Sequence, residues 1–365
     1  MTPENNNNLS VRAAAAKASF VTRRVKLGDA RQLVTDRSPR SGDLILARVV
    51  KIKRQTRLEL RNGRRAHLYE SDELVLAYGN RYASDQYEAG VPDHLGPCQL
   101  VAAGGIAAKV ISKHGNIRDA TEIKPLGLLA GIKGNILNLA DYALPVIGGN
   151  KPRPLTVAVF GSSMNSGKTT MVSDLVHGAC RLGIKVSAAK LTGTGSGPDI
   201  WKVVDAGASE MLDFTDEGYA STAGLELQQL LSISRNLIAR TTTNDTKLLV
   251  LEIADGLLQQ ETRALLESPE FRRLIDGCLF ASSDSVAAVA AVNYLQSLPL
   301  DVLAIGGIMT QSSLTPREAV SACGIPYLKR CDLQRKAVVR SLLRELTDVQ
   351  KRAQQESGNV IAIGN

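Results

Sequence analysis

The residues best suited to chemistry lie in one short run, Gly161 to Thr170, which reads Gly-Ser-Ser-Met-Asn-Ser-Gly-Lys-Thr-Thr. Lys168 supplies an ammonium group and Thr169 a hydroxyl, while the small residues before them leave room for the main chain to curve. The N–H groups of such a bend, at the start of a helix, point at an anion that the helix dipole also favours. The pattern predicts a polyphosphate cradle, with Lys168 at the terminal phosphates and Thr169 as a Mg²⁺ ligand.

The flanking residues match this interpretation. Residues 155–160, Leu-Thr-Val-Ala-Val-Phe, predict a buried strand, and residues 171–182 carry apolar side chains at helical spacing before Gly183. Strand, loop and helix in this order are the context that a phosphate-binding P-loop requires. We expect ATP as the nucleotide, with GTP open. The residues predicted to bind it are Gly161, Ser162, Asn165, Ser166, Gly167, Lys168, Thr169 and Thr170.

A second candidate group is the acid that ends the run Leu248-Leu-Val-Leu-Glu252. In an open parallel sheet the carboxyl ends of the strands line the ligand crevice, so Glu252 should lie beside the loop. Its carboxylate is a ligand type that Mg²⁺ prefers. Asp255, three residues further on, is the alternative.

The spacing of the loop points to a narrower resemblance. Five residues, rather than the usual four, separate Gly161 from Gly167. This spacing resembles dethiobiotin synthetase and its relatives in the SIMIBI branch of P-loop proteins, and the wording Asn-Ser-Gly-Lys-Thr-Thr is similar to MobB-type GTPases. The resemblance covers roughly residues 155–330 and implies an α/β fold with a mostly parallel sheet and a homodimer.

Further residue roles are implied by that resemblance. Lys190, at the end of a strand predicted at residues 185–191, becomes a second phosphate-neutralising cation and is assigned with Lys168 to catalysis. Asp199 joins Thr169 and Glu252 as a metal ligand, with Asp205 as its competitor because the intervening loop is short. Residues 193–210 also resemble an uncharacterised bacterial family of proposed ATP-dependent ligases.

The chain before about residue 147 has a different residue pattern. Short alternating runs, such as residues 44–50 and 58–61, predict strands, and Asn62-Gly63 favours a tight hairpin. Several such runs predict a small, mostly β, barrel-like domain. The polar and aromatic stretch Tyr78–Glu88, with Arg81 and Asp85, is interpreted either as a surface loop or as a recognition site.

These patterns divide the chain into five parts. Residues 1–40 are expected to form a mobile basic arm, 41–146 the mostly-β domain and 147–154 a Gly- and Pro-rich linker. Residues 155–330 should form the P-loop α/β domain, and 331–365 a terminal helix and tail. A chain starting near Asn150 is then expected to fold alone.

Composition limits the remaining possibilities. Of 365 residues, 44% are hydrophobic and 22% charged, and no window approaches the roughly 18 apolar residues of a membrane span. The start of the chain does not resemble a signal peptide, so we expect a cytoplasmic protein without a membrane partner. Five scattered cysteines, with no Cys-x-x-Cys pair, argue against a thiolate zinc site.

The net charge of +8 is concentrated early, since residues 1–65 hold 16 Lys and Arg against 5 Asp and Glu. This surplus is consistent with a nucleic-acid partner, but a solvated arm and barrel exterior is the favoured interpretation.

The sequence therefore predicts an ATP- and Mg²⁺-dependent enzyme. It would activate a carboxylate or carbamate by γ-phosphoryl transfer and pass it to an amine, so its partner would be a small-molecule acceptor. The alternative is a nucleotide-dependent switch or assembly factor, an ATPase or GTPase that acts on a macromolecule through its basic N-terminal region.

Overall fold

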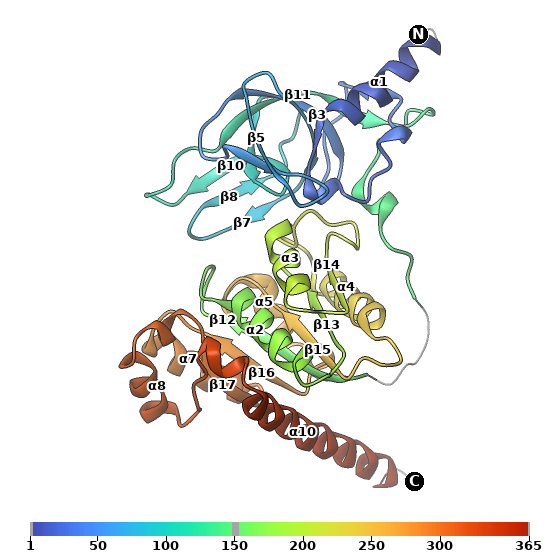
Figure 1. The fold of residues 1–365 in the computed structure, drawn as a ribbon. Helices are drawn as coiled ribbons and strands as arrows, with labels where there is room; N and C mark the ends of the chain where they lie inside the picture. The colour runs from blue at the N-terminus through green and yellow to red at the C-terminus, as the bar shows by residue number, and fades with distance from the viewer. Residues whose placement is uncertain (1–2, 148–152, 364–365) are drawn as a thin grey trace. The chain divides into compact units, whose positions relative to one another are not determined.

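A computed structural model describes residues 3–147 and 153–363 of the chain (Figure 1). These residues belong to two compact units. The β unit comprises Met1–Val146, Gly193–Trp201 and Asp213–Leu225, and the α/β unit comprises Ile147–Thr192, Lys202–Leu212 and Glu226–Asn365. Most of the expected linker, residues 148–152, lies outside the described residues, as do residues 1–2 and 364–365.

Short strands make up most of the β unit. They are β1 (Lys17–Ala18), β2 (Gln32–Val34), β3 (Leu44–Lys51), β4 (Arg57–Glu59), β5 (Arg65–His67), β6 (Glu73–Tyr78), β7 (Arg81–Tyr82), β8 (Tyr87–Gly90), β9 (Cys98–Ala102), β10 (Ile106–Lys113) and β11 (Thr121–Ala130). One helix, α1 (Pro3–Ala15), precedes them.

Five of these strands pair in a closed ring. Strand β6 pairs with β3, β3 with β11, β11 with β9 and β9 with β10, all antiparallel, and β10 pairs back to β6 in parallel. Alternate side chains of this ring, among them Ile45, Leu74, Leu100 and Ile123, form the buried core. The predicted mostly-β character is seen in this largely antiparallel sheet.

The Asn62-Gly63 hairpin is present, but its turn differs from the predicted one. Strands β4 and β5 pair antiparallel, with Arg57 opposite His67. The connection runs over five residues, Leu60 to Arg64, and Gly63 is its one residue with positive φ, +84°. A type I′ turn needs positive φ at both central residues, so this is a longer loop.

Residues 3–40, which the sequence predicts to be a mobile arm, contain a helix and short strands. After helix α1, strand β1 pairs in parallel with β6, and Phe20 is fully buried. Arg12 of α1 binds Glu73 of β6, with Nη2 2.5 Å from Oε1. The apolar residues that dock this segment are few and widely spaced, so they give little periodic signal in an asparagine-rich stretch.

The stretch Tyr78–Glu88 forms paired strands instead of the long surface loop that was one of its two interpretations. Strands β7 and β8 pair with Arg81 opposite Ala89. Arg81 is buried, lies over the Tyr87 ring at 5.7 Å from its centroid, and donates to Gln86 at 2.9 Å. These contacts give the stretch a packing role.

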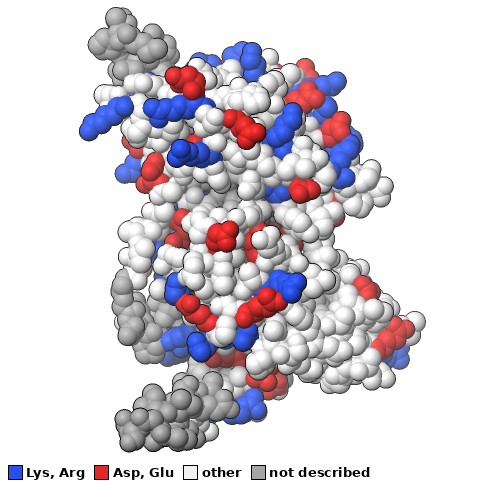
Figure 2. Space-filling view, turned by 180° about the vertical axis from the view of Figure 1, so that it is seen from behind, with Lys and Arg blue, Asp and Glu red and all other residues white. Residues whose placement is uncertain are grey.

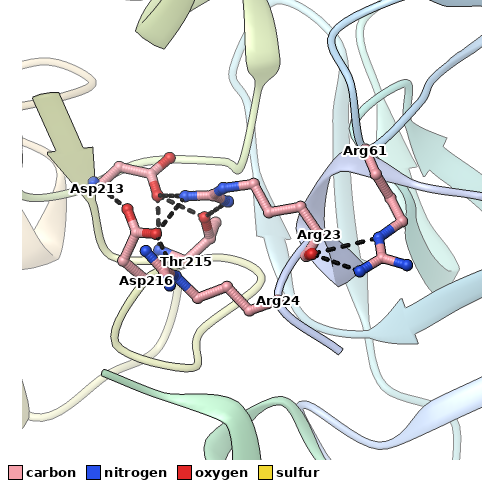
Figure 3. Close-up of polar contacts among 6 residues, drawn as sticks. All are labelled: Arg23, Arg24, Arg61, Asp213, Thr215 and Asp216. Carbon is pink, nitrogen blue, oxygen red and sulfur yellow. Dashed lines mark hydrogen bonds and ion pairs between the residues drawn. The ribbon is translucent and has the colours of Figure 1, made fainter. Parts of the chain in front are cut away.

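The segment Asp213–Leu225 is fixed in the β unit by ion pairs (Figure 3). Arg23 lies 3.2 Å from Asp213 and 2.7 Å from Asp216, whose side chains are only 1% and 2% exposed. Arg24 binds Asp216 at 2.6 Å, and Thr215 donates its hydroxyl to Asp213. Removing a partner from a buried ion pair is costly, so these arginines hold the segment in place.

The α/β unit is built on a six-stranded sheet in the order β14-β13-β15-β12-β16-β17. The strands are β12 (Leu155–Gly161), β13 (Val186–Lys190), β14 (Glu210–Asp213), β15 (Leu248–Glu252), β16 (Gly277–Ala281) and β17 (Val302–Gly306). The pairs β13–β15, β15–β12, β12–β16 and β16–β17 are parallel. This agrees with the predicted α/β fold with a mostly parallel sheet.

Helices connect and cover these strands (Figure 1). They are α2 (Lys168–Cys180), α3 (Gly197–Asp205), α4 (Leu227–Thr241), α5 (Gln260–Glu267), α6 (Pro269–Arg272), α7 (Ser285–Ser297), α8 (Thr315–Cys323), α9 (Arg330–Leu333) and α10 (Lys336–Ile363). Helices α5 and α6 are separate because Ser268 caps a new helix that begins with Pro269. Strand β14 and helix α3 were not expected.

The charged surface of the β unit is mixed. On the face seen in Figure 2, Lys and Arg side chains are interspersed with Asp and Glu. Among the described residues, no helix has the length and apolar character needed to cross a membrane.

Candidate functional site

The loop between β12 and α2 bends tightly because Gly161 has no side chain. A Cβ at Gly161 would lie 2.3 Å from Ser166 Oγ and 2.8 Å from Lys168 Cγ. Asn165 and Gly167 then take positive φ, +61° and +107°. Glycine adopts this conformation without strain and asparagine tolerates it better than most residues. The loop therefore has the curvature that the sequence predicts.

Lys168 folds back across the mouth of this loop. It is the first residue of α2 and is 5% exposed, and its Nζ donates to the carbonyl of Ser163 at 2.8 Å and of Asp255 at 2.5 Å. The ammonium group thus lies between the phosphate loop and the loop after β15. A phosphate oxygen entering the cradle would meet a cation already held in position.

Thr169 and Glu252 meet at the edge of the sheet. The Thr169 hydroxyl donates to Glu252 Oε1 at 2.9 Å. Glu252 ends β15 and is 2% exposed, and β15 pairs directly with the loop strand β12. The sequence interpretation that Glu252 lies beside the loop is matched by this geometry.

Lys190 ends the neighbouring strand β13 and is the Cα partner of Glu252 in the parallel register. It is 5% exposed. Two buried lysines thus lie near Glu252: Lys168 is the first residue of α2, and Lys190 is the last residue of β13. Buried positive charge at this edge suits a ligand that carries several negative charges.

Other predicted loop residues have structural partners. Ser162 donates its N–H to Ala281 at 2.9 Å. The Thr170 hydroxyl accepts from Lys202 Nζ at 2.6 Å, within the α/β unit. Sequence reasoning missed Lys202, because α3 was interpreted as a loop and nothing in the local pattern marks this lysine.

A threonine clamp joins the ends of β13 and β15. Thr192 Oγ1 donates to the carbonyl of Ala254 at 2.6 Å and accepts its N–H at 2.9 Å. A Cβ at Gly256 would lie 2.6 Å from the Ser162 carbonyl. The loop after β15 therefore packs directly against the phosphate loop.

The loop after β17 closes the other side, and sequence reasoning missed it as well. Gly307 has φ +86°, and a Cβ there would lie 2.4 Å from the Ser166 carbonyl. Ile308 donates its N–H to that same carbonyl at 3.0 Å. The pair Gly306-Gly307 after an apolar strand was the available signal.

The other candidate acids come from different segments of the chain. Asp199 is in the first turn of α3, within the segment Gly193–Trp201 of the β unit, while Asp205 ends the same helix and belongs to the α/β unit. Asp255 offers its main-chain carbonyl to Lys168. The assignment of Asp199 as a metal ligand stays a prediction.

The donor set fits Mg²⁺ and a polyphosphate. A hydroxyl and a carboxylate meet at one point, which supplies the hard oxygen ligands that Mg²⁺ takes. The absence of a side chain at Gly161, where a Cβ would clash with Ser166, lets the loop curve tightly. Thr169 and Glu252 would hold the metal ion, and the loop amides with Lys168 would hold the phosphates.

Strand, glycine loop, helix and acid-ended neighbouring strand define a P-loop α/β unit. No protein-family model and no curated protein matches the chain. The narrower resemblance to dethiobiotin synthetase stays a prediction from the sequence.

Among solved structures, the chain is similar to the signal recognition particle 54 kDa protein of Aeropyrum pernix K1 in complex with GDP. The two are 18% identical over 57% of this chain and 50% of that chain, with a TM-score of 0.37. For the receptor FtsY of Elizabethkingia anophelis in complex with GDP, the identity is 15% over 50% and 58%, with a TM-score of 0.34. Chloroplast FtsY of Physcomitrella patens is 16% identical over 52% and 62%, with a TM-score of 0.35.

The chain therefore spans between 50% and 62% of the length of these three proteins. These partial similarities carry no argument about activity or partners. The class of the α/β unit rests on its own loop and strand order.

Proposed function

We propose that this chain hydrolyses a nucleoside triphosphate, ATP or GTP, in a Mg²⁺-dependent reaction at the P-loop. The observation that carries the proposal is the contact of Thr169 with Glu252 at 2.9 Å, at the joint of helix α2 and strand β15. Two buried lysines, Lys168 and Lys190, support it, because positive charge at this edge of the sheet attracts a triphosphate, which carries several negative charges.

Hydrolysis requires positioning and charge neutralisation more than a covalent nucleophile. A water oxygen bonds to the γ-phosphorus, the bond to the β–γ bridging oxygen breaks, and the water proton passes to the released phosphate. The loop amides and Lys168 stabilise the phosphoryl oxygens, and Lys190 adds a second positive charge. Mg²⁺, when bound, supplies further neutralisation of the β- and γ-phosphates.

We further propose that the nucleotide state controls a macromolecular partner. The segment Gly193–Trp201 begins one residue after Thr192, which is clamped to Ala254, yet it belongs to the β unit. Within that unit the Gly197 N–H donates to Glu59 at 3.0 Å. A segment connected in this way can carry a change at the strand ends of β13 and β15 into the β unit.

The β unit would then present the partner-binding surface. Several basic side chains of its first 65 residues are occupied by ion pairs inside the unit. These are Arg12, Arg23, Arg24, Arg48, Lys17 and Lys53. We therefore favour a protein partner over nucleic acid.

The second candidate is the acid-activating ligase. The placement of Lys190 opposite Glu252 favours it, because a second cation suits transfer of the γ-phosphoryl group to a carboxylate or carbamate. The acyl phosphate formed would then react with an amine and release phosphate.

Phosphate release separates the two candidates. A switch should turn over slowly with ATP or GTP alone and respond to a macromolecular fraction, which affinity capture with the intact chain would identify. A ligase should respond at least about tenfold to one small carboxylate or amine in a metabolite panel, which corresponds to about 1.4 kcal/mol in the barrier. Stimulation by a small molecule, with none by macromolecules, would reject the switch.

A further inference from the structure

A pocket within the α/β unit lies beside the phosphate loop. The proposed hydrolysis does not use it. It occupies about 530 Å³, including space open to solvent. Its walls come from the first turn of α2, the loop after β17 and the start of α9.

The pocket adjoins the phosphate loop. Gly167 and Thr170 line it, and both are residues of the loop run. Gly307, another lining residue, approaches so closely that a Cβ at Gly167 would lie 3.1 Å from its Cα. A ligand with its phosphates in the cradle would therefore extend the rest of its structure into this pocket.

The lining suits a flat group with apolar faces and polar edges. Met171, Leu328 and Ile308 contribute apolar surface, and Ile308 remains 41% exposed although it is a large hydrophobic residue. An exposed apolar side chain beside a polar loop gains from a planar ring that covers it. Nucleobases have such rings.

The rim supplies hydrogen-bonding groups at defined positions. Asp174 of α2 is 4% exposed and accepts from Arg330 Nε at 2.9 Å and from Gln334 Nε2 at 2.8 Å. This fixes Arg330 at the pocket edge. Gln311 also lines the pocket, and its amide both donates and accepts.

We infer that this pocket holds the base and ribose of the nucleoside triphosphate, with Ile308 against the face of the base and Gln311 at its polar edge. The inference rests on the proposed function, since the triphosphate fixes the other end of the ligand. These contacts with the base would let the chain distinguish one nucleotide from another.

Inorganic tripolyphosphate separates this inference from the proposed function, because it has phosphates but no base. Calorimetry on the full chain with Mg²⁺ would compare tripolyphosphate, ATP and GTP in wild type and in Ile308→Ser. We expect the variant to bind its preferred nucleotide about tenfold more weakly, about 1.4 kcal/mol, and tripolyphosphate within about twofold of wild type. Leu314→Ser is the matched control, since Leu314 is 63% exposed and lies outside the pocket lining.

Gln311→Ala tests the edge of the base. The ratio of ATP to GTP affinity should move toward one, and an unchanged ratio would remove Gln311 from that role.

The outcomes distinguish the two claims. If wild type binds tripolyphosphate as tightly as ATP and GTP, or if Ile308→Ser weakens tripolyphosphate and nucleotide equally, the pocket inference fails while the P-loop proposal stands. If wild type binds none of the three, both fail.

Discussion

Glu252 places a carboxylate in a buried position, where a charged group is costly unless it has a partner. It is 2% exposed, accepts the Thr169 hydroxyl and has Lys190 as its register partner. Buried carboxylates are retained where they are paired or bind a metal. Its place beside the P-loop helix is the basis of our proposal that Glu252 binds Mg²⁺.

Glu252→Gln keeps the shape of this strand end and removes its charge. We expect Mg²⁺-dependent turnover to fall by at least about 100-fold, since a group that stabilises the transition state contributes on this order. Metal-free nucleotide binding should change little. Glu267→Gln, at an exposed partner of Arg263, is the control. Full activity with the same Mg²⁺ dependence would reject Glu252 as a ligand and leave Asp255 as the next candidate.

Gly307 offers a second test at the residue scale. The Cβ of an alanine there would lie 2.4 Å from the Ser166 carbonyl oxygen. The alanine would also have to adopt the positive φ of +86°, which is strained for any residue with a side chain. We expect the free energy of unfolding to fall by about 1–3 kcal/mol, the cost of a strained residue, and nucleotide affinity to fall with it.

Gly183→Ala is the matched control, because Gly183 has φ +76° but no atom within 4 Å of its Cβ position. It should cost some stability and leave nucleotide affinity unchanged. Equal effects of the two substitutions on affinity, measured by calorimetry, would argue against close packing of Gly307 on the phosphate loop.

Residue types and spacing could predict those site residues whose signals lie within one short run of sequence. Gly161 to Thr170 are contiguous, and Glu252 ends an apolar strand, so one run of sequence contains each signal. Lys202 and Gly307 come from distant segments that only the tertiary fold brings to the loop. Their roles depend on packing that no local pattern encodes.

At the element scale, helix α1 is attached to the β unit by charge. Arg12 and Arg48 both bind Glu73 of β6, at 2.5 Å and 2.9 Å. The hydrogen bond from Arg12 lowers the pKa of Glu73 from 4.5 to about 2. The ionised form of Glu73 therefore favours the folded state.

Glu73→Gln should reveal this contribution as a pH dependence. A carboxyl whose pKa is lower in the folded state stabilises the fold above its unfolded value, and that stability is lost as pH falls from about 4.5 toward about 2. We expect a loss of about 1 kcal/mol at pH 7, since the pair is partly exposed, and a shrinking difference below pH 4.5. Urea midpoints between pH 3 and 7 measure it, with exposed Glu70→Gln as the control. A difference that does not vary with pH would contradict this account.

Elements were predictable where their patterns are regular. Strands β12, β13, β15, β16 and β17 are apolar runs bounded by turn residues, and α2 has a continuous apolar face. Strand β14 is only four residues long, and α3 begins with Gly-Pro-Asp in a glycine-rich stretch that favours a loop. In both cases tertiary contacts outweigh weak local preference.

At the scale of the whole molecule, the β unit includes two segments from the C-terminal part of the chain. Gly193–Trp201 and Asp213–Leu225 interrupt the α/β unit in sequence and belong to the β unit. The linker composition alone favours a C-terminal half that folds by itself. The segment Asp213–Leu225 favours the opposite outcome, since its buried acids Asp213 and Asp216 bind Arg23 and Arg24.

A protein lacking residues 1–146 should therefore fold poorly. Its Asp213 and Asp216 would lose their arginines, and an unpaired buried charge costs about 3–5 kcal/mol, a large part of the about 5–15 kcal/mol that stabilises a domain. Circular dichroism and chromatography should show unfolded or aggregated protein. The full chain cleaved between residues 148 and 152 is the control, since it keeps both parts. A well-folded truncated protein with full nucleotide affinity would show that the contacts of these segments with residues 1–146 are dispensable.

Calorimetric titration of the full chain with ATP and GTP, with and without Mg²⁺, tests the central claim most directly. The account predicts that at least one nucleotide binds, that Mg²⁺ tightens it by at least about tenfold, and that Lys168→Ala abolishes binding while its circular dichroism spectrum stays that of wild type. Lys185→Ala, at an exposed lysine paired with Asp245, should bind as wild type does. Equal affinity in Lys168→Ala and wild type, or no heat from either nucleotide at millimolar concentration, would contradict the claim that this loop binds a nucleoside triphosphate.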